Sequence, residues 1–171
     1  KATSGERRHG TSVRVWPDGK YFESPKYSMP ELERLLRAKA VLLPGSVVLL
    51  NTEKTNGETE QKQWRYPNGL TSYLEEMLGD DEPIVPIFAG EKYIPVGDDS
   101  FAEGEGAAWA FVWLEGAGGG ESYVNLIPTA SGGTHEAGLR TGIFDALKLF
   151  IDHHNLLPRG VKLQAEDCWS K

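Results

Sequence analysis

The side chains of this chain that could do chemistry gather between Thr129 and Arg140, where a Gly-Gly-Thr turn precedes a histidine, a glutamate and an arginine. Gly132-Gly133-Thr134 stands where a strand meets a helix, and the first N–H groups of a helix are unpaired and attract anions. The sequence contains neither G-x-x-x-x-G-K-[ST] nor G-x-G-x-x-G, the glycine motifs of phosphate-binding loops. We therefore favour a tight turn with a threonine cap, and keep a small-anion binding module as the alternative.

The histidines are better explained by structural roles than by catalysis. His135 lies within reach of Glu136 and Asp145, but no Ser or Cys nucleophile stands in a recognisable elbow, so a catalytic triad has no support. His153 and His154 close the same predicted helix. Adjacent helical side chains point about 100 degrees apart and cannot both bind one metal ion without distortion. We predict no catalytic residue and no metal site.

Arg140 is the remaining charge of interest near the glycines. It lies about one and a half turns along the helix predicted from His135, and Glu136 precedes it by one turn. Oppositely charged side chains at this spacing pair on a helix surface. By spacing alone, Arg140 is predicted to pair with Glu136 or to face solvent.

A strand, a glycine turn and a long helix must position these residues. The apolar run Tyr123–Ile127 predicts a strand that Pro128 ends, and we expect it to pair with a buried strand at Ala107–Leu114. Ile84–Ile94, interrupted by proline and glycine, predicts an edge or bulged strand. The helix is predicted from His135 to about Asn155, and an apolar stripe indicates that it packs on the sheet. The stripe consists of Leu139, Ile143, Leu147, Phe150 and Ile151.

The N-terminal half predicts a strand, a helix and a hairpin. Gly10–Trp16 alternates like a strand, with Tyr21-Phe22 as a short partner, and Ser28 precedes a helix that carries Pro30 in its first turn. Ser46–Asn51 is a continuous apolar run, typical of a strand covered on both faces. Asn56-Gly57 then predicts a hairpin turn, with the returning strand at Gln63–Tyr66.

Pro67-Asn68-Gly69 marks the predicted boundary between two parts, residues 1–68 and 69–171. An amphipathic helix at Leu70–Leu78 opens the second part. Ala165-Glu166-Asp167 begins another helix close to the last residue, which indicates a piece of a longer protein.

Composition sets outer limits on function. The chain has 171 residues, 39% of them hydrophobic, and no apolar run approaches the ~20 residues of a membrane span. A formal net charge of -7 argues against a free-standing nucleic-acid binder, although the first forty residues lean basic and leave room for a local basic face. The single Cys168 excludes an internal disulfide framework, and we expect it to be a partly buried, small apolar side chain rather than a reactive thiol. We expect a cytoplasmic protein that does not associate with membranes.

Two motifs carry a family resemblance. N-L-I-P-T-x-x-G-G-T-H-x-x-G-L-R, at residues 125–140, and L-P-R-G-V-K-L-x-A-E-D, at residues 157–167, resemble the B subunits of bacterial type IIA topoisomerases. Y-V-N-L-I-P-T and L-P-R-G-V-K-L resemble the topoisomerase IV branch, the ParE family, more than the gyrase branch. G-T-S-V-R-V-W-P-D and L-L-R-A-K-A-V-L-L-P-G match as well, so the resemblance covers essentially the whole chain.

The resemblance implies an α+β fold of two-layer α/β sandwiches. Residues 1–68 would be the C-terminal portion of a GHKL ATPase domain, and residues 69–171 an incomplete transducer domain with a left-handed βαβ crossover and a ribosomal-protein-like fold. In the family, Thr11 and Val13 correspond to positions that line the nucleotide and inhibitor pocket. Arg140 corresponds to an arginine that lines the positive cavity through which the transported DNA duplex passes.

The resemblance also implies an ATP-dependent DNA topoisomerase that relaxes and decatenates DNA. ATP and Mg²⁺ would bind to the intact protein, with no cofactor bound to these residues alone, since the family's catalytic glutamate would precede Lys1 and its Gln-Thr-Lys loop would follow Lys171. The implied partners are the transported DNA, the A subunit of topoisomerase IV and a second B subunit. A gyrase B subunit, which introduces negative supercoils, remains an alternative. A purely structural or protein-interaction domain, which would dimerise through Ala107–Leu114, is a further alternative.

Overall fold

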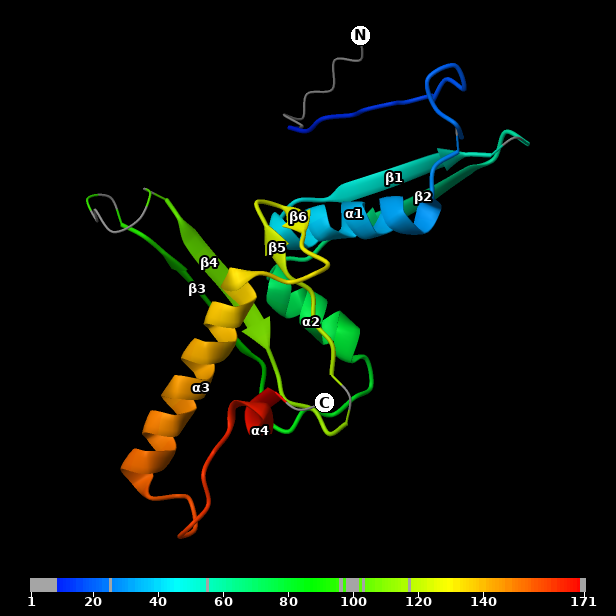
Figure 1. Cartoon of the computed structure of the whole chain (residues 1–171). Coiled ribbons are helices and arrows are strands. Elements are labelled where there is room, and N and C mark those ends of the chain that lie inside the picture. The colour runs from blue at the N-terminus through cyan, green and yellow to red at the C-terminus, as the bar shows by residue number, and fades with distance from the viewer. Residues whose placement is uncertain are drawn as a thin grey trace.

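The computed structural model describes residues 9–24, 26–54, 56–95, 97, 102, 104–116 and 118–169. Helices and two-stranded antiparallel sheets alternate through these residues, which confirms the α+β class (Figure 1). Every strand pair among them is antiparallel. A βαβ crossover joins two parallel strands of one sheet, so the described strands do not form the left-handed crossover.

Helix α1 (Met29–Leu42) begins where the sequence predicts it. Ser28 occupies the N-cap position without a side-chain cap hydrogen bond, and a proline stands in the first turn. Proline is tolerated there because its missing N–H would have had no partner in the helix. Ala38, Ala40 and Val41 lie on the buried side of the helix.

Strands β1 (Val48–Glu53) and β2 (Thr59–Trp64) form the predicted hairpin, in a register that pairs Val48 with Trp64, but the returning strand begins at Thr59 rather than at the predicted Gln63 and ends before Tyr66. Gly57 closes the turn with a φ of 86°, a value that glycine adopts without strain. The prediction that the apolar run at Ser46–Asn51 is covered on both faces is wrong. Side chains of β1 alternate between half-buried and exposed, and Leu49 is 51% exposed, because α1 packs on one face only.

The core of this region joins α1, the hairpin and helix α2 (Leu70–Leu78), whose bounds match the prediction. Ala40, Val41 and Tyr66 are buried, and Leu70 and Tyr73 of α2 pack against them. The core therefore extends across the predicted boundary at Pro67-Asn68-Gly69, and the division into two domains stays a prediction.

Strands β3 (Phe88–Tyr93) and β4 (Gly106–Phe111) form a second hairpin, with Phe88 opposite Phe111. Their rings lie 5.1 Å apart, a cross-strand aromatic pair that stabilises this register. The predicted pairing of Tyr123–Ile127 with Ala107–Leu114 is wrong. That segment instead folds on itself as strands β5 (Tyr123–Val124) and β6 (Ile127–Pro128).

Helix α3 (Thr134–His154) and helix α4 (Ala165–Trp169) agree with the predicted bounds within a residue or two. The prediction that the stripe of α3 packs on the sheet is wrong, since Leu139 and Phe150 are 36% and 56% exposed and no described residue of α3 is buried. In Figure 1 the helix runs away from β5 and β6, and its packing partner is α4.

The predicted strand at Gly10–Trp16 does not form, and Tyr21 lies in a turn rather than in a partner strand. Val13, Val15 and Trp16 are 78%, 57% and 69% exposed. An alternating sequence becomes a strand only where its backbone groups find a neighbouring edge. Among the described residues, an ion pair between Arg14 and Glu53 joins this segment to the adjacent β1–β2 hairpin.

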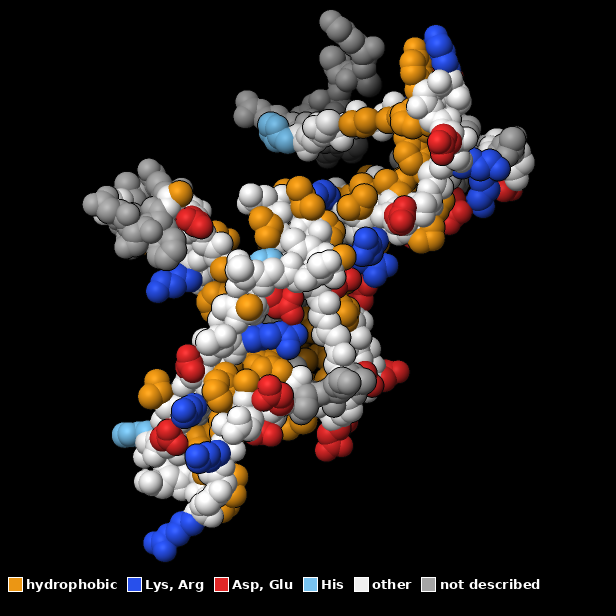
Figure 2. Space-filling view, in the orientation of Figure 1, with side chains coloured by type: hydrophobic (Ala, Val, Ile, Leu, Met, Phe, Trp, Pro, Cys, Tyr) orange, Lys and Arg blue, Asp and Glu red, His pale blue; other side chains and the backbone are white. Residues whose placement is uncertain are grey.

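Exposed apolar side chains recur over the face shown in Figure 2, on the N-terminal segment and around α3. Among the described residues, no helix combines the length and the apolar character that crossing a membrane requires.

Candidate functional site

The β5–β6 hairpin turns through two residues that are not glycine. Asn125 and Leu126 have φ values of 48° and 69°, so both adopt the left-handed conformation of a two-residue hairpin turn. Asparagine tolerates this conformation, whereas for leucine it costs on the order of 1 kcal/mol. The turn therefore needs support from its surroundings.

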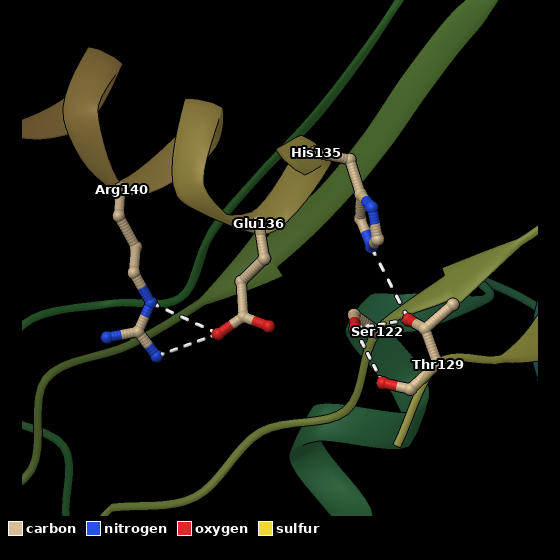
Figure 3. A network of polar contacts seen from close by, with 5 residues as sticks. All are labelled: Ser122, Thr129, His135, Glu136 and Arg140. Atoms are coloured by element: carbon tan, nitrogen blue, oxygen red, sulfur yellow. Dashed lines mark hydrogen bonds and ion pairs between the residues drawn. The ribbon is translucent and has the colours of Figure 1, made fainter. Parts of the chain in front are cut away.

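The two ends of the hairpin are joined to each other and to the start of α3. The Thr129 N–H donates to the Ser122 carbonyl at 2.8 Å, and the two hydroxyl oxygens lie 2.6 Å apart. Thr129 Oγ1 lies 3.5 Å from Nε2 of His135, in the first turn of α3 (Figure 3). His135 thus has the hydrogen-bonded structural position that the sequence favours.

The arrangement in Figure 3 is not that of a catalytic triad. A triad needs a carboxylate that orients the histidine, and the nearby carboxylate, Glu136, points instead at Arg140. Ser122 and His135 each contact Thr129 rather than each other.

The Glu136 carboxylate occupies the space beside Gly132, where the β5–β6 hairpin leads into α3. Gly132 has a φ of 69°, and a Cβ built on it would lie 2.8 Å from Oε2 of Glu136. That negative charge in the first turn of α3 already complements the helix dipole and would repel a bound anion. The predicted threonine cap is wrong, because Gly133 is the N-cap residue and Thr134 is the first residue of the helix.

Arg140 is held from two sides. Its Nε and Nη2 atoms donate to Oε1 of Glu136 at 3.1 and 3.0 Å, which confirms the pairing predicted from spacing. The guanidinium carbon also lies 5.2 Å from the centre of the Trp169 ring. A cavity of about 990 Å³ opens beside Arg140, between α3 and α4. Half of the side chain's surface remains exposed, so the cation is oriented but not enclosed.

A second cavity, of about 560 Å³, lies between α1 and the β5–β6 hairpin. Arg34 lines it from α1, and Glu121 and Glu136 line it from the other side. With more carboxylates than cations, this cavity is a poor place for a small anion.

The structure does not bring Thr11 and Val13 together with Arg140. Both side chains are exposed in the N-terminal segment, and neither lines either of the two cavities. Their assignment to a nucleotide pocket stays a prediction. The structure also pairs the rings of His153 and His154, 5.0 Å apart and nearly perpendicular, and no cluster of metal-ligating side chains occurs in the described ranges.

Two contacts that sequence reasoning missed hold the hairpin against α1 and α2. Nζ of Lys39, on α1, donates to the carbonyl oxygen of Leu126. The Tyr73 hydroxyl, on α2, donates to Glu121 at 3.3 Å, and Tyr123 donates to the same carboxylate oxygen. The sequence held one signal for the first contact, because Lys39 falls within the apolar side of α1.

Burial raises the pKa of the Tyr73 and Tyr123 hydroxyls, and the neighbouring Glu121 carboxylate raises each pKa further. Both phenols are therefore protonated donors at neutral pH. They keep Glu121 in place at the base of the hairpin.

Comparison with known proteins gives one consistent result. The DNA gyrase B family model matches residues 69–171, which is more than half of the chain. The B subunits of DNA topoisomerase 4 from Pseudomonas aeruginosa and Escherichia coli are each 44% identical, over 99% of this chain. The Haemophilus influenzae protein of that name is 45% identical over the same share. The chain spans about a quarter of the length of these relatives, 26% in each case.

Proposed function

This chain belongs to the DNA gyrase B family, and on that premise we propose that it is part of the ATPase subunit of a topoisomerase IV. Its role is to carry the effect of ATP binding and hydrolysis to DNA strand passage, which relaxes and decatenates DNA. The observation that carries the proposal is the similarity to the B subunits of topoisomerase 4 over 99% of the chain, both N-terminal and C-terminal to Gly69.

We propose that the two parts of the chain, residues 1–68 and 69–171, have different roles. The first part contributes the end of a nucleotide-binding GHKL domain, and the second part is a transducer whose α3 carries the DNA-contacting Arg140. Contacts between the two parts support the proposal that a movement of the first reaches the second. Helices α1 and α2 share a core, and α1 contacts the β5–β6 hairpin that precedes α3.

ATP and Mg²⁺ are proposed for the intact protein, with Thr11 and Val13 in contact with the nucleotide. These two residues offer one hydroxyl and one apolar side chain, and neither of them lines either of the two cavities described above. They do not by themselves fit a nucleotide, so we derive no step of hydrolysis from the described residues.

Arg140 is proposed to contact the phosphate backbone of the transported duplex. A guanidinium can donate two parallel hydrogen bonds to phosphate oxygens, and half of the Arg140 side chain remains exposed beside Glu136. Lys148, Arg159 and Lys162, all exposed, lie along the outer end of α3 and the loop after it, where Figure 2 shows Lys and Arg side chains interspersed with Asp and Glu. No ion pair engages these three within the described residues.

The proposed partners are the transported DNA, the A subunit of topoisomerase IV, and a second B subunit in the ATP-bound state. We also propose a cytoplasmic location, in keeping with these partners. The gyrase alternative is less favoured because the relatives described above carry the topoisomerase 4 name.

The test uses the full-length protein, assembled with the A subunit of the same enzyme. Linked DNA circles and relaxed plasmid are offered with ATP, and we expect decatenation without the introduction of negative supercoils. Negative supercoiling would favour gyrase, and failure of both reactions would refute the proposal. Arg140→Ala is expected to reduce strand passage, whereas Arg65→Ala, an exposed arginine on the other side of Gly69, serves as the control.

A further inference from the structure

A single lysine connects α1 to the hairpin that leads into α3. Nζ of Lys39 donates to the carbonyl oxygen of Leu126, which is 87 residues away in the sequence, and the contact is partly buried. Lys39 has no carboxylate partner among the described residues, so this carbonyl is the group that its charge engages.

The accepting carbonyl belongs to the conformationally costly residue of the turn. Leu126 has a φ of 69° and follows Asn125, which is also left-handed. Without support, a leucine at this position favours other turn conformations, and the two short strands are too few to impose one. A charge-assisted hydrogen bond to this carbonyl favours the observed turn over its competitors.

The base of the hairpin connects directly to the helix that carries Arg140. Ser122 and Thr129 are joined by three contacts: a backbone hydrogen bond of 2.8 Å, a hydroxyl pair at 2.6 Å, and a hydrogen bond of 3.3 Å from the Ser122 hydroxyl to the Thr129 carbonyl oxygen. His135 contacts Thr129, and the next residue, Glu136, holds Arg140. On the opposite side, Glu121 accepts a hydrogen bond from Tyr73 of α2 at 3.3 Å. Thus α1 holds the turn, α2 holds the base, and α3 begins where the hairpin ends.

We propose that Lys39 is a positioning residue that fixes the β5–β6 hairpin to α1, so that a movement of the N-terminal part reaches the start of α3 and Arg140. The coupling role rests on the proposed function, whereas the fixing of the hairpin can be measured without it. Lys39 acts through Leu126 and contacts neither nucleotide nor DNA.

The experiment compares Lys39→Met, Lys39→Arg and Lys62→Met in the full-length protein, together with the A subunit. Methionine keeps an unbranched apolar stem nearly as long as that of lysine but removes the charge, and arginine restores a donor. Lys62 is the matched control, because it also makes a cross-element contact from the N-terminal part, at 2.7 Å to Glu33, but does not touch the hairpin. Lys39→Gln, which retains a neutral donor, replaces Lys39→Met if circular dichroism shows that the latter is unfolded.

The first readout is hydrogen exchange at peptides that contain residues 123–132, which include the Thr129 and Gly132 amides. Lys39→Met is expected to speed exchange there by roughly ten-fold, the size expected for loss of a hydrogen bond to a charged group. Lys39→Arg should restore the slow exchange and Lys62→Met should leave it unchanged. Equal exchange in Lys39→Met and Lys62→Met would overturn the proposal.

The second readout separates coupling from folding. Lys39→Met is expected to leave the KM for ATP within about two-fold of the unmodified protein while decatenation events per ATP hydrolysed fall several-fold. A merely structural lysine would change both together or neither, and an unchanged ratio would overturn the coupling role. If the unmodified protein does not decatenate DNA, the proposed function fails, and the exchange measurement still decides whether Lys39 fixes the hairpin.

Discussion

Arg140 donates from both Nε and Nη2 to the same oxygen of Glu136, at 3.1 and 3.0 Å, one helical turn apart on α3. The two side chains are 50% and 37% exposed, and an exposed pair at this spacing contributes only about 0.3–0.5 kcal/mol. Such a pair orients the guanidinium without committing it to one partner. A DNA phosphate can therefore compete with Glu136 for Arg140.

The first prediction concerns the salt dependence of DNA binding by the full-length protein. If Arg140 contacts a phosphate, Arg140→Ala should weaken binding for all sequences alike, and the slope of log K against log salt should become shallower by about one. Glu136→Gln keeps the side chain's shape but removes the competing charge, and it should strengthen binding at low salt. The slopes are measured by fluorescence anisotropy on a labelled duplex.

Arg65→Ala is the control for these slopes, since it removes an exposed arginine that lies before α2. Equal slopes for Arg140→Ala and Arg65→Ala would contradict a specific phosphate contact. Weaker binding by Glu136→Gln would show that Glu136 is needed to aim the arginine rather than competing for it.

The second prediction uses the two glycines that bracket α2. Gly69 and Gly79 have nearly the same φ, 55° and 54°, so alanine at either is strained by about 1–3 kcal/mol. The two glycines differ in how much room a Cβ atom would have. A Cβ on Gly69 would lie 2.9 Å from Cγ of Pro44 and 3.1 Å from the Val41 carbonyl oxygen, whereas a Cβ on Gly79 would meet nothing within 4 Å.

Gly69→Ala should therefore lower the free energy of unfolding by about 1–3 kcal/mol more than Gly79→Ala, because the backbone of α1 cannot move away easily. Chemical denaturation of the two variants, with the unmodified protein alongside, measures the difference. Similar losses in the two variants would mean that the packing of Pro44 on Gly69 is not tight in solution.

Local signals in the sequence predicted the helices well. Ser28 and Pro30 mark the start of α1, the apolar spacing from Leu70 gives α2, and Asn56-Gly57 gives the first hairpin. Each of these signals acts within one turn of helix or one tight turn of chain, so neighbouring residues suffice to determine the outcome. The Arg140 pair with Glu136 was predictable for the same reason.

Strand partners were not predictable from such signals. Tyr123–Ile127 looks like one strand, but the left-handed pair Asn125 and Leu126 splits it into a hairpin, and leucine gives no warning of that conformation. β4 pairs with β3 through the Phe88–Phe111 contact, a choice between distant segments that alternation cannot make. The contact between Lys39 and Leu126 is likewise a property of the tertiary fold.

The third prediction is a loss of stability at alkaline pH. Burial raises the pKa of the Tyr66 hydroxyl from its ordinary 10.0, and Glu76 raises it further. In the unfolded chain this tyrosine ionises near pH 10, while the folded protein retains the proton. The folded state therefore binds more protons above pH 10, and the stability present below that pH is lost as pH rises.

The free energy of unfolding should be level up to about pH 9 and then fall, with Tyr66 contributing at most about 1.4 kcal/mol per pH unit. Tyr66→Phe should make the fall less steep, because phenylalanine has no proton to lose, while the raised pKa values of Tyr73 and Tyr123 account for the remainder. Tyr21→Phe is the matched control, since Tyr21 is 73% exposed. Urea denaturation across pH 7 to about 11 measures these slopes, and an identical fall in Tyr66→Phe would exclude the buried hydroxyl as its source.

The fourth prediction contrasts two tryptophans that pack 6.4 Å apart beside α4. Nε1 of Trp113 donates to the Cys168 carbonyl at 3.0 Å, whereas Nε1 of Trp169 is buried without a hydrogen-bond partner in the described part of the chain. Phenylalanine removes the N–H in either case. At Trp113 it leaves the carbonyl unpaired, and at Trp169 it removes an unpaired donor, which offsets the lost apolar contact.

Trp113→Phe should therefore lower the free energy of unfolding by about 1–2 kcal/mol more than Trp169→Phe. Thermal or urea denaturation of the two variants gives the difference, and Trp16→Phe, at a residue that is 69% exposed, shows the effect of the substitution away from α4. If Trp169→Phe were the more damaging variant, the contact between its ring and Arg140 would outweigh the unpaired N–H. Salt would then distinguish the two explanations, because a cation over an aromatic ring at a half-exposed site weakens as ionic strength rises, whereas packing does not.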